Sequence, residues 1–193
     1  MNFLAHMYLS GDNPELMIGN FIGDYVKGSQ YRDFPVKVAR GILFHREIDE
    51  YTDTHPISKV GKARVRHRFR HYSGVAVDMF YDHFLAIDFN SYHPLQLNQF
   101  IEKNFNILQK NHHILPEKVQ KFLPYMIRDN WIINYTTVEG IQRSLSGVSR
   151  RTPFKSNLEF AGEELKSHYE SFRKDFKSFF PDLKTHCLRY LEQ

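Results

Sequence analysis

The segment from residue 41 to 56 carries side chains that could bind a metal ion. His45 and Asp49 are four residues apart, so on an α-helix they share one face, and Asp53 follows one turn later. Apolar neighbours such as Ile48 indicate that this face is buried. A buried imidazole and carboxylate are costly unless they are paired or bind a cation. A satisfied His–Asp hydrogen bond at a helix end is the alternative interpretation.

A second apolar segment repeats the pattern, with Asp78 and Asp82 one helical turn apart and His83 next to them. Two further apolar segments, nearer the N-terminus, contain Asp24 and His6. Four separate segments therefore each offer a histidine or an aspartate from an apolar background. This pattern predicts that they converge on one cation-binding pocket.

The types of these side chains indicate which ions and which chemistry to expect. The chain has a single cysteine, Cys187, which excludes a structural zinc site built from thiolates. Imidazole and carboxylate ligands with open positions suit Mn²⁺, Fe²⁺, Mg²⁺ or catalytic Zn²⁺. Such ions acidify bound water and neutralise charge on phosphoryl oxygens, so we expect metal-assisted hydrolysis of a phosphate ester.

Motifs in the first half of the chain carry a family resemblance. They are Met1-Asn2-Phe3-Leu4-Ala5-His6, Gly19-Asn20-Phe21-Ile22-Gly23-Asp24, His45-Arg46-x-Ile48-Asp49, Thr52-Asp53-x-x-Pro56 and Asp78-x-x-x-Asp82-His83-Phe84-Leu85. In this order they resemble the bacterial acyl carrier protein phosphodiesterases. The second half is similar more loosely, through its length, its helical pattern and Ser149-Arg150-Arg151-x-Pro153.

The resemblance implies an all-α, single-domain helical bundle akin to the HD superfamily of metal-dependent phosphohydrolases. It also implies removal of the 4′-phosphopantetheine arm from holo-acyl carrier protein, with Mn²⁺ or Mg²⁺ as the usual ion. The chain has no His-Asp dipeptide, the signature of that superfamily. Its nearest equivalents are the spaced pair His45 and Asp49 and the reversed pair Asp82-His83.

These patterns together predict a set of site residues. The expected metal ligands are Asp24, His45 and Asp82, and further candidates in or beside the ligand shell are His6, Asp49 and Asp78. Asp49 is also a candidate catalytic residue, His83 a candidate general acid for the serine leaving group, and Arg46 a candidate phosphate contact. The ion would lower the pKa of the attacking water and stabilise the equatorial oxygens.

Length and composition are those of one globular domain that spans residues 1–193. Apolar residues make up 41% of the chain and charged residues 25%, and aromatic residues are abundant at 15%. We find no apolar run long enough to cross a membrane and no secretion signal. The lone cysteine fits a reducing compartment, so we expect a cytoplasmic protein.

Turn signals and apolar periodicity predict helices almost throughout and make strands improbable. One helix is expected to begin at Pro14, and others to cover about 35–51, 57–72, 75–89, 94–111, 116–131, 136–148 and 155–180, with a short tail after Pro181. The phenylalanines at 172, 176, 179 and 180 form a stripe that predicts a core-facing surface.

A basic run lies between the two segments richest in potential ligands. Its cations are Lys59, Lys62, Arg64, Arg66, Arg68 and Arg70, and no Asp or Glu lies between residues 57 and 77. On a helix, Lys62, Arg66 and Arg70 form one stripe, with Arg64 and Arg68 on an adjacent face. A solvated helix surface is the alternative, but the missing anions favour an acidic partner. Acyl carrier protein, which is acidic, is the partner that the resemblance implies, and no nucleic acid is expected.

Two other function classes remain open at this point. One is a related helical phosphohydrolase that acts on a small nucleotide, which would have little need of the basic run. The other is a non-enzymatic binding module whose polar core residues are structural, in which case removal of metal should leave its stability unchanged.

Overall fold

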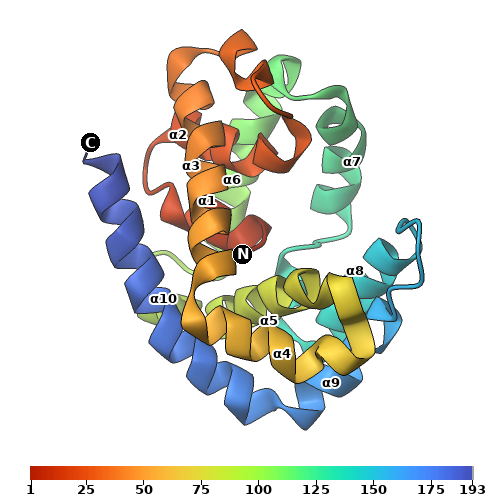
Figure 1. Cartoon of the computed structure of the whole chain (residues 1–193). Helices are drawn as coiled ribbons and strands as arrows, with labels where there is room; N and C mark the ends of the chain where they lie inside the picture. The colour runs from red at the N-terminus through yellow and green to blue at the C-terminus, as the bar shows by residue number, and fades with distance from the viewer. Residues whose placement is uncertain (193) are drawn as a thin grey trace.

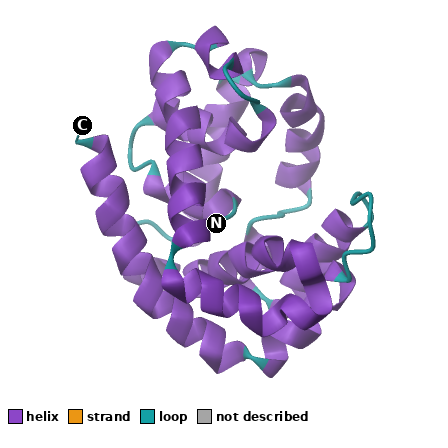
Figure 2. Cartoon of the chain, viewed as in Figure 1, coloured by secondary structure: helices purple, strands orange, loops and turns teal. Residues whose placement is uncertain are grey.

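Helices joined by short turns build the structure, a computed structural model that describes residues 1–192 (Figures 1 and 2). This described range contains no strand, which confirms the all-α prediction. None of its helices combines the length and the apolar character that a membrane crossing requires.

The α-helices are connected in places by single 3₁₀ turns. The α-helices are α1 (Phe3–Leu9), α2 (Pro14–Ile22), α3 (Val36–Thr54), α4 (Pro56–Phe69), α5 (Ser73–Ile87), α6 (Leu97–Lys110), α7 (Glu117–Arg128), α8 (Val138–Ser149), α9 (Ala161–Ser167) and α10 (Tyr169–Leu191). The 3₁₀ turns are η1 (Gly23–Tyr25), η2 (Gln30–Asp33), η3 (Arg70–Tyr72), η4 (Phe89–Ser91), η5 (His112–Ile114), η6 (Ile133–Thr136) and η7 (Leu158–Phe160).

The short helix α1 lies in the middle of the molecule (Figure 1). It packs against α2 on one side and against α5 on the other. The long helix α10 runs along one edge and contacts α3, α4 and α5. The N-terminus is therefore placed where the helices of the first half of the chain meet.

Local sequence signals start the helices that matter for the site. Asn13 accepts a hydrogen bond from the backbone N–H of Leu16, and Pro14 occupies the first turn, so α2 begins there. His55 caps α4 in the same way, with Pro56 in its first turn. The proline also ends α3, because the residue before a proline disfavours helical geometry.

A pair of glycines lets α2 and α3 cross at close range. A Cβ atom on Gly19 would lie 2.0 Å from the carbonyl oxygen of Val38 and 2.8 Å from the Cα of Gly41. Any larger residue at either glycine would push the two helices apart. This contact fixes the position of the second half of α3, which carries His45 and Asp49, relative to α2.

The predicted phenylalanine stripe is buried, as expected. Phe172, Phe176, Phe179 and Phe180 are all fully buried on α10. They pack against α5, where the ring centroids of Phe80 and Phe172 are 5.0 Å apart. Burial of each such ring contributes about 2–3 kcal/mol, so this seam is a major part of the core.

The C-terminal region differs from the prediction in two ways. The expected helix 155–180 is divided, because η7 and α9 precede a break at His168. The expected tail after Pro181 is instead helical, and α10 continues to Leu191. Pro181 removes one backbone donor, but Leu183 and Cys187 are buried and His186 pairs with Glu47 at 2.7 Å. Tertiary packing thus outweighs the helix-breaking tendency of the proline.

Candidate functional site

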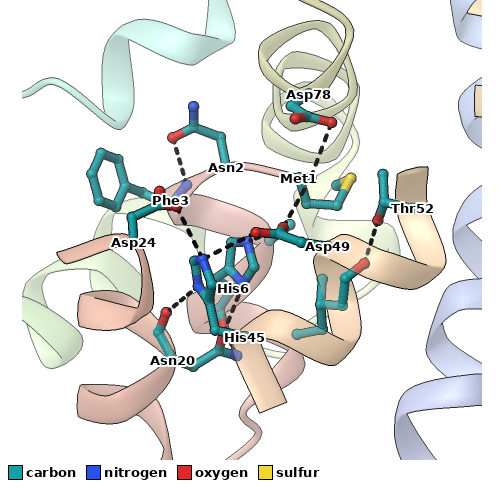
Figure 3. Close-up of polar contacts among 12 residues, drawn as sticks. Met1, Asn2, Phe3, His6, Asn20, Asp24, His45, Asp49, Thr52 and Asp78 are labelled. Atoms are coloured by element: carbon teal, nitrogen blue, oxygen red, sulfur yellow. Dashed lines mark hydrogen bonds and ion pairs between the residues drawn. The ribbon is translucent and has the colours of Figure 1, made fainter. Parts of the chain in front are cut away.

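Three side chains converge from α1 and α3 into one group that could hold a metal ion. Each of His6, His45 and Asp49 offers one ligand atom, and these atoms all lie within 4.8 Å of one another (Figure 3). Nε2 of His45 is 3.1 Å from Asp49 Oδ2, and Nε2 of His6 is 3.3 Å from Asp49 Oδ1. Two of the four segments therefore supply these three residues, which we call the metal group because they could hold an ion.

Asn20 of α2 orients both imidazoles. Its side-chain nitrogen donates to the carbonyl oxygen of His6 at 2.7 Å and to Ser10 Oγ at 2.9 Å, so its Oδ1 atom must be the acceptor that faces His6 Nδ1 at 2.7 Å. Its backbone oxygen accepts from His45 Nδ1, also at 2.7 Å. Each histidine therefore carries a proton on Nδ1, which leaves Nε2 free to act as a ligand atom.

The two Nε2 atoms are buried and have no hydrogen-bond partner within residues 1–192. In each neutral ring, a nitrogen lone pair faces the Asp49 carboxylate, which is repulsive unless positive charge lies between them. Burial lowers the pKa of His45, but Asp24 and Asp49 outweigh burial and raise that pKa to about 9. Burial opposes ionisation of Asp49, but the two histidines outweigh it and hold the pKa of Asp49 well below its ordinary value. Without a metal, a proton on His45 supplies the charge, and a divalent cation could replace it.

Gly23 makes the space that the His45 ring occupies. A Cβ atom at this position would lie 2.2 Å from Cγ of His45. The φ of Gly23 is −52°, so its backbone conformation suits other residues too, and only the close contact requires glycine.

We expect Gly23→Ala to displace the His45 ring and weaken metal binding by at least tenfold, as loss of ligand orientation typically does. Calorimetric titration with Mn²⁺ measures this. Gly74→Ala is the matched control, because its nearest neighbour atom would be 3.8 Å away. Equal affinity in the two variants would contradict this role of Gly23.

Two more aspartates border the group. Asp24 Oδ1 is 3.4 Å from His45 Nε2, and the Asp24 side chain is 69% exposed, so it lies on the open side. Asp78 Oδ1 is 3.1 Å from the amino nitrogen of Met1, which is also 3.8 Å from Asp49 Oδ1. Asp78 therefore reaches the group through the amino nitrogen of Met1, as Figure 3 shows.

The chain is similar to known proteins over nearly its whole length. The acyl carrier protein phosphodiesterase family matches residues 1–183. The chain belongs to this family. It is 31% identical to the acyl carrier protein phosphodiesterase of Photorhabdus laumondii subsp. laumondii over 182 residues, which cover 94% of this chain and 92% of that protein. The proteins of that name from Enterobacter sp. (strain 638) and Escherichia coli O6:H1 are 30% and 29% identical, over 94% and 98% of each chain.

No solved structure matches the chain. Membership of the acyl carrier protein phosphodiesterase family makes the chain an enzyme, so the non-enzymatic alternative is not retained. The predicted family resemblance is thereby confirmed, whereas the likeness to the HD superfamily stays a prediction.

Asp82, which the sequence predicted to be a metal ligand, does not belong to the group formed by His6, His45 and Asp49. It is fully buried, and its carboxylate accepts hydrogen bonds from the backbone N–H groups of Asn2 at 3.0 Å, Leu4 at 2.9 Å and Ala5 at 3.4 Å. It therefore caps the first turn of α1 from α5. Burial raises the pKa of Asp82 to about 7, although these backbone hydrogen bonds and the Met1 amino group oppose the shift. The geometry favours a structural role.

The other two expected catalytic residues also have structural partners. His83 donates from Nδ1 to the carbonyl oxygen of Tyr135 at 2.7 Å, and its Nε2 is 3.0 Å from the Tyr169 hydroxyl. Arg46 donates to the carbonyl oxygen of Val26 at 3.0 Å. These contacts occupy both ring nitrogens and one end of the guanidinium. The catalytic roles remain predictions, and the geometry favours positioning roles.

The basic run is partly neutralised by anions from distant segments, contrary to the sequence-based expectation. Arg64 pairs with Asp175 of α10 at 2.5 Å. Arg68 pairs with Glu163 of α9 at 2.5 Å and with Glu164 at 3.2 Å. Lys62 pairs with Asp53 at the end of α3. Among the described residues, no ion pair reaches Lys59, Arg66 or Arg70, so the available positive surface is smaller than predicted.

Sequence reasoning assigned no role to Asn20 or Gly23. Both lie in the segment Gly19-Asn20-Phe21-Ile22-Gly23-Asp24, which was singled out for its aspartate. A buried asparagine on an apolar helix is the signal that could have indicated Asn20, because a buried amide needs hydrogen-bond partners. Nothing in the sequence indicated that Gly23 faces His45.

Proposed function

We propose that the chain hydrolyses the phosphodiester that joins 4′-phosphopantetheine to the serine of holo-acyl carrier protein. The products would be apo-carrier and 4′-phosphopantetheine. The observation that carries this proposal is the group of His6, His45 and Asp49, whose two orphan Nε2 atoms face one carboxylate. Family membership and the names of the relatives support the choice of substrate.

The residues present fit a divalent cation. Two imidazole nitrogens and a carboxylate, oriented by Asn20 and bordered by the exposed Asp24, are a mixed ligand set with room for water and substrate. Mn²⁺ suits this set better than Mg²⁺, which prefers oxygen ligands. The cation, when bound, would lower the pKa of water and neutralise charge on the phosphoryl oxygens.

The chain's own residues would prepare the site for that chemistry. Asn20 holds the Nδ1 proton of both imidazoles, so that Nε2 faces the pocket in each. Asp49 supplies the negative charge that a cation requires. The imidazole of His45, with Nε2 3.4 Å from Asp24 Oδ1, lowers the pKa of Asp24, which keeps that side chain ionised at neutral pH. A carboxylate at this open edge can accept a hydrogen bond from an attacking water and orient it toward phosphorus.

The decisive experiment incubates the purified protein and Mn²⁺ with holo-acyl carrier protein and follows the carrier by intact-mass spectrometry. We expect conversion to apo-carrier that stops when a chelator is added. A guanosine tetraphosphate-type nucleotide is tested in parallel. Unchanged holo-carrier together with hydrolysis of the nucleotide would replace the proposed reaction with the small-nucleotide alternative.

We further propose that the acidic carrier docks on the part of α4 and η3 around Arg66 and Arg70. Both side chains are exposed, and neither is neutralised within the described chain. By contrast, Arg64 also stacks over the Phe172 ring at 4.8 Å, so its loss would disturb packing. The proposed docking surface is therefore limited to the cations without partners.

Reversal of both charges, Arg66→Glu with Arg70→Glu, should raise KM for holo-carrier roughly tenfold at low salt and leave kcat nearly unchanged, because rim charges mainly steer encounter. The effect should shrink as salt rises. The control reverses two exposed lysines on α6 and α7, Lys110→Glu with Lys121→Glu. An equal rise in KM in both proteins would show that the effect comes from the net charge of the protein and not from these positions. Helix α4 would then not be part of the docking surface.

A further inference from the structure

A cleft of about 510 Å³ lies between the N-terminal turn and α8. Asn2, Phe3 and Met79 line one part of it, and Trp131 and Val148 line another. Its size is typical of sites for small organic ligands. Its lining includes no residue of the metal group and neither of the two arginines of the proposed docking surface on α4 and η3.

The cleft adjoins the metal group. Asn2 and Met79 directly follow Met1 and Asp78 in the chain, and the Met1 amino nitrogen is 3.1 Å from Asp78 Oδ1. The same nitrogen is 3.8 Å from Asp49 Oδ1. Figure 3 shows Asn2 and Phe3 beside the metal group. A ligand in the cleft could therefore place one end next to Asp49.

Three arginines make the cleft strongly cationic. Arg143, Arg150 and Arg151 line it, and none of them forms an ion pair within residues 1–192. Asp129, an acidic residue of the lining, is held by Arg128 at 2.6 Å. Arg151 Nε donates to the carbonyl oxygen of Gly147 at 3.1 Å, which orients that guanidinium. Guanidinium groups bind phosphate by strong charge-assisted hydrogen bonds.

An aromatic wall links the cleft to the open edge of the metal group. The rings of Trp131 and Phe122 are stacked, with centroids 6.2 Å apart. The ring centroid of Phe122 is 5.3 Å from that of Tyr25, which follows Asp24 in the chain. The cleft thus combines an apolar wall with cations near the site of reaction.

We propose that this cleft receives the 4′-phosphopantetheine arm, with its phosphate toward Arg151 and its chain along Trp131. The assignment rests on the proposed function and adds the part of the enzyme that recognises the prosthetic group. An arm with an anionic end and a chain of amide and aliphatic groups matches both the arginines and the apolar wall. Arg143 and Arg151 are then binding residues for the arm rather than part of the carrier docking surface.

Two kinds of variant test this assignment. Arg143→Gln with Arg151→Gln removes cations from the cleft. Gly147→Leu, on α8, fills the cleft with a larger side chain. The variant should fold, because the nearest atom to a new Cβ would be 3.8 Å away and leucine favours the helix more than glycine does. Lys121→Gln, an exposed substitution on α7 that lies outside the cleft lining, is the control. Each Mn²⁺-loaded protein is titrated with 4′-phosphopantetheine and with pantetheine by calorimetry and is assayed with holo-carrier.

We expect the double arginine variant to weaken 4′-phosphopantetheine binding and raise KM roughly tenfold or more, with kcat changed less than about threefold and pantetheine binding unchanged. Gly147→Leu should abolish detectable binding of both probes while Mn²⁺ affinity stays as in wild type. If wild type turns over holo-carrier but Kd and KM are unchanged in both variants, the cleft assignment is wrong and the proposed function stands. A raised KM with unchanged Kd for 4′-phosphopantetheine would assign the arginines to the carrier instead. Wild type that leaves holo-carrier intact would remove both proposals.

Discussion

Asp49→Asn is expected to lower kcat/KM for holo-carrier by on the order of 10²–10³-fold or more, comparable to the loss of a central electrostatic group in other enzymes. The Asp49 carboxylate lies 3.3 Å from His6 Nε2 and 3.1 Å from His45 Nε2, so the substitution removes the one carboxylate that both imidazoles face. Asparagine has nearly the same shape as aspartate, but it carries no negative charge and replaces one carboxylate oxygen with an amide nitrogen, which does not coordinate a cation. Mn²⁺ affinity should fall in parallel, which calorimetry measures directly.

Asp53→Asn is the matched control on the same helix. Asp53 lies one turn beyond Asp49, is exposed, and pairs with Lys62 rather than with a histidine. We expect its Mn²⁺ affinity and turnover to stay within about threefold of wild type, as is usual for an exposed ion pair. Full activity and full Mn²⁺ affinity in a folded Asp49→Asn protein would refute the proposal that this group binds the cation.

Asp82→Asn should change how stability depends on pH. Burial raises the pKa of Asp82 to about 7 from an ordinary value of 3.8. Between those two pH values the folded protein binds more protons at this site than the unfolded chain, so this site makes the protein less stable as pH rises through the window. The loss is up to about 4 kcal/mol by pH 7. Asparagine cannot ionise, so the variant should lose none of this stability.

Denaturant unfolding of wild type and Asp82→Asn at several pH values from 4 to 8, with a chelator present, measures the difference. We expect the free energy of unfolding of the variant, relative to wild type, to increase with pH and level off above pH 7. The part of the stability difference that does not change with pH reports the backbone hydrogen bonds that the amide nitrogen of asparagine cannot accept. A constant difference would contradict the raised pKa. If the variant also lost Mn²⁺ affinity, Asp82 would be a ligand, as the sequence suggested.

Several features were determined by the sequence alone, because they depend on local periodicity. The four-residue spacing of His45 and Asp49 puts them on one face of any helix, and α3 extends past both residues. The phenylalanine stripe from 172 to 180 predicted a buried face for the same reason, and all four rings are buried. Family motifs predicted the family to which the chain belongs.

Other features depend on contacts between distant residues, which spacing does not encode. Arg64 and Arg68 read as unpaired because no acidic residue is near them in sequence, but their partners come from α9 and α10. Helix α10 passes through Pro181 because its last turns pack against α3, where His186 meets Glu47. In both cases the stabilising contacts are made with a surface that forms only when the chain is folded.

The membership of the site was likewise decided by tertiary structure. His6 and Asp82 both stand in apolar segments, so the sequence treated them alike, but their surroundings differ. The close crossing of α2 and α3 at Gly19 places Asn20 next to both His6 and His45, and its hydrogen bonds to Nδ1 of each ring direct both rings at Asp49. Asp82 instead meets the free N–H groups at the start of α1, which take up its lone pairs. Which polar side chain joins the candidate metal group and which becomes a cap depends on the helix that packs against it, and a local pattern carries no information about that helix.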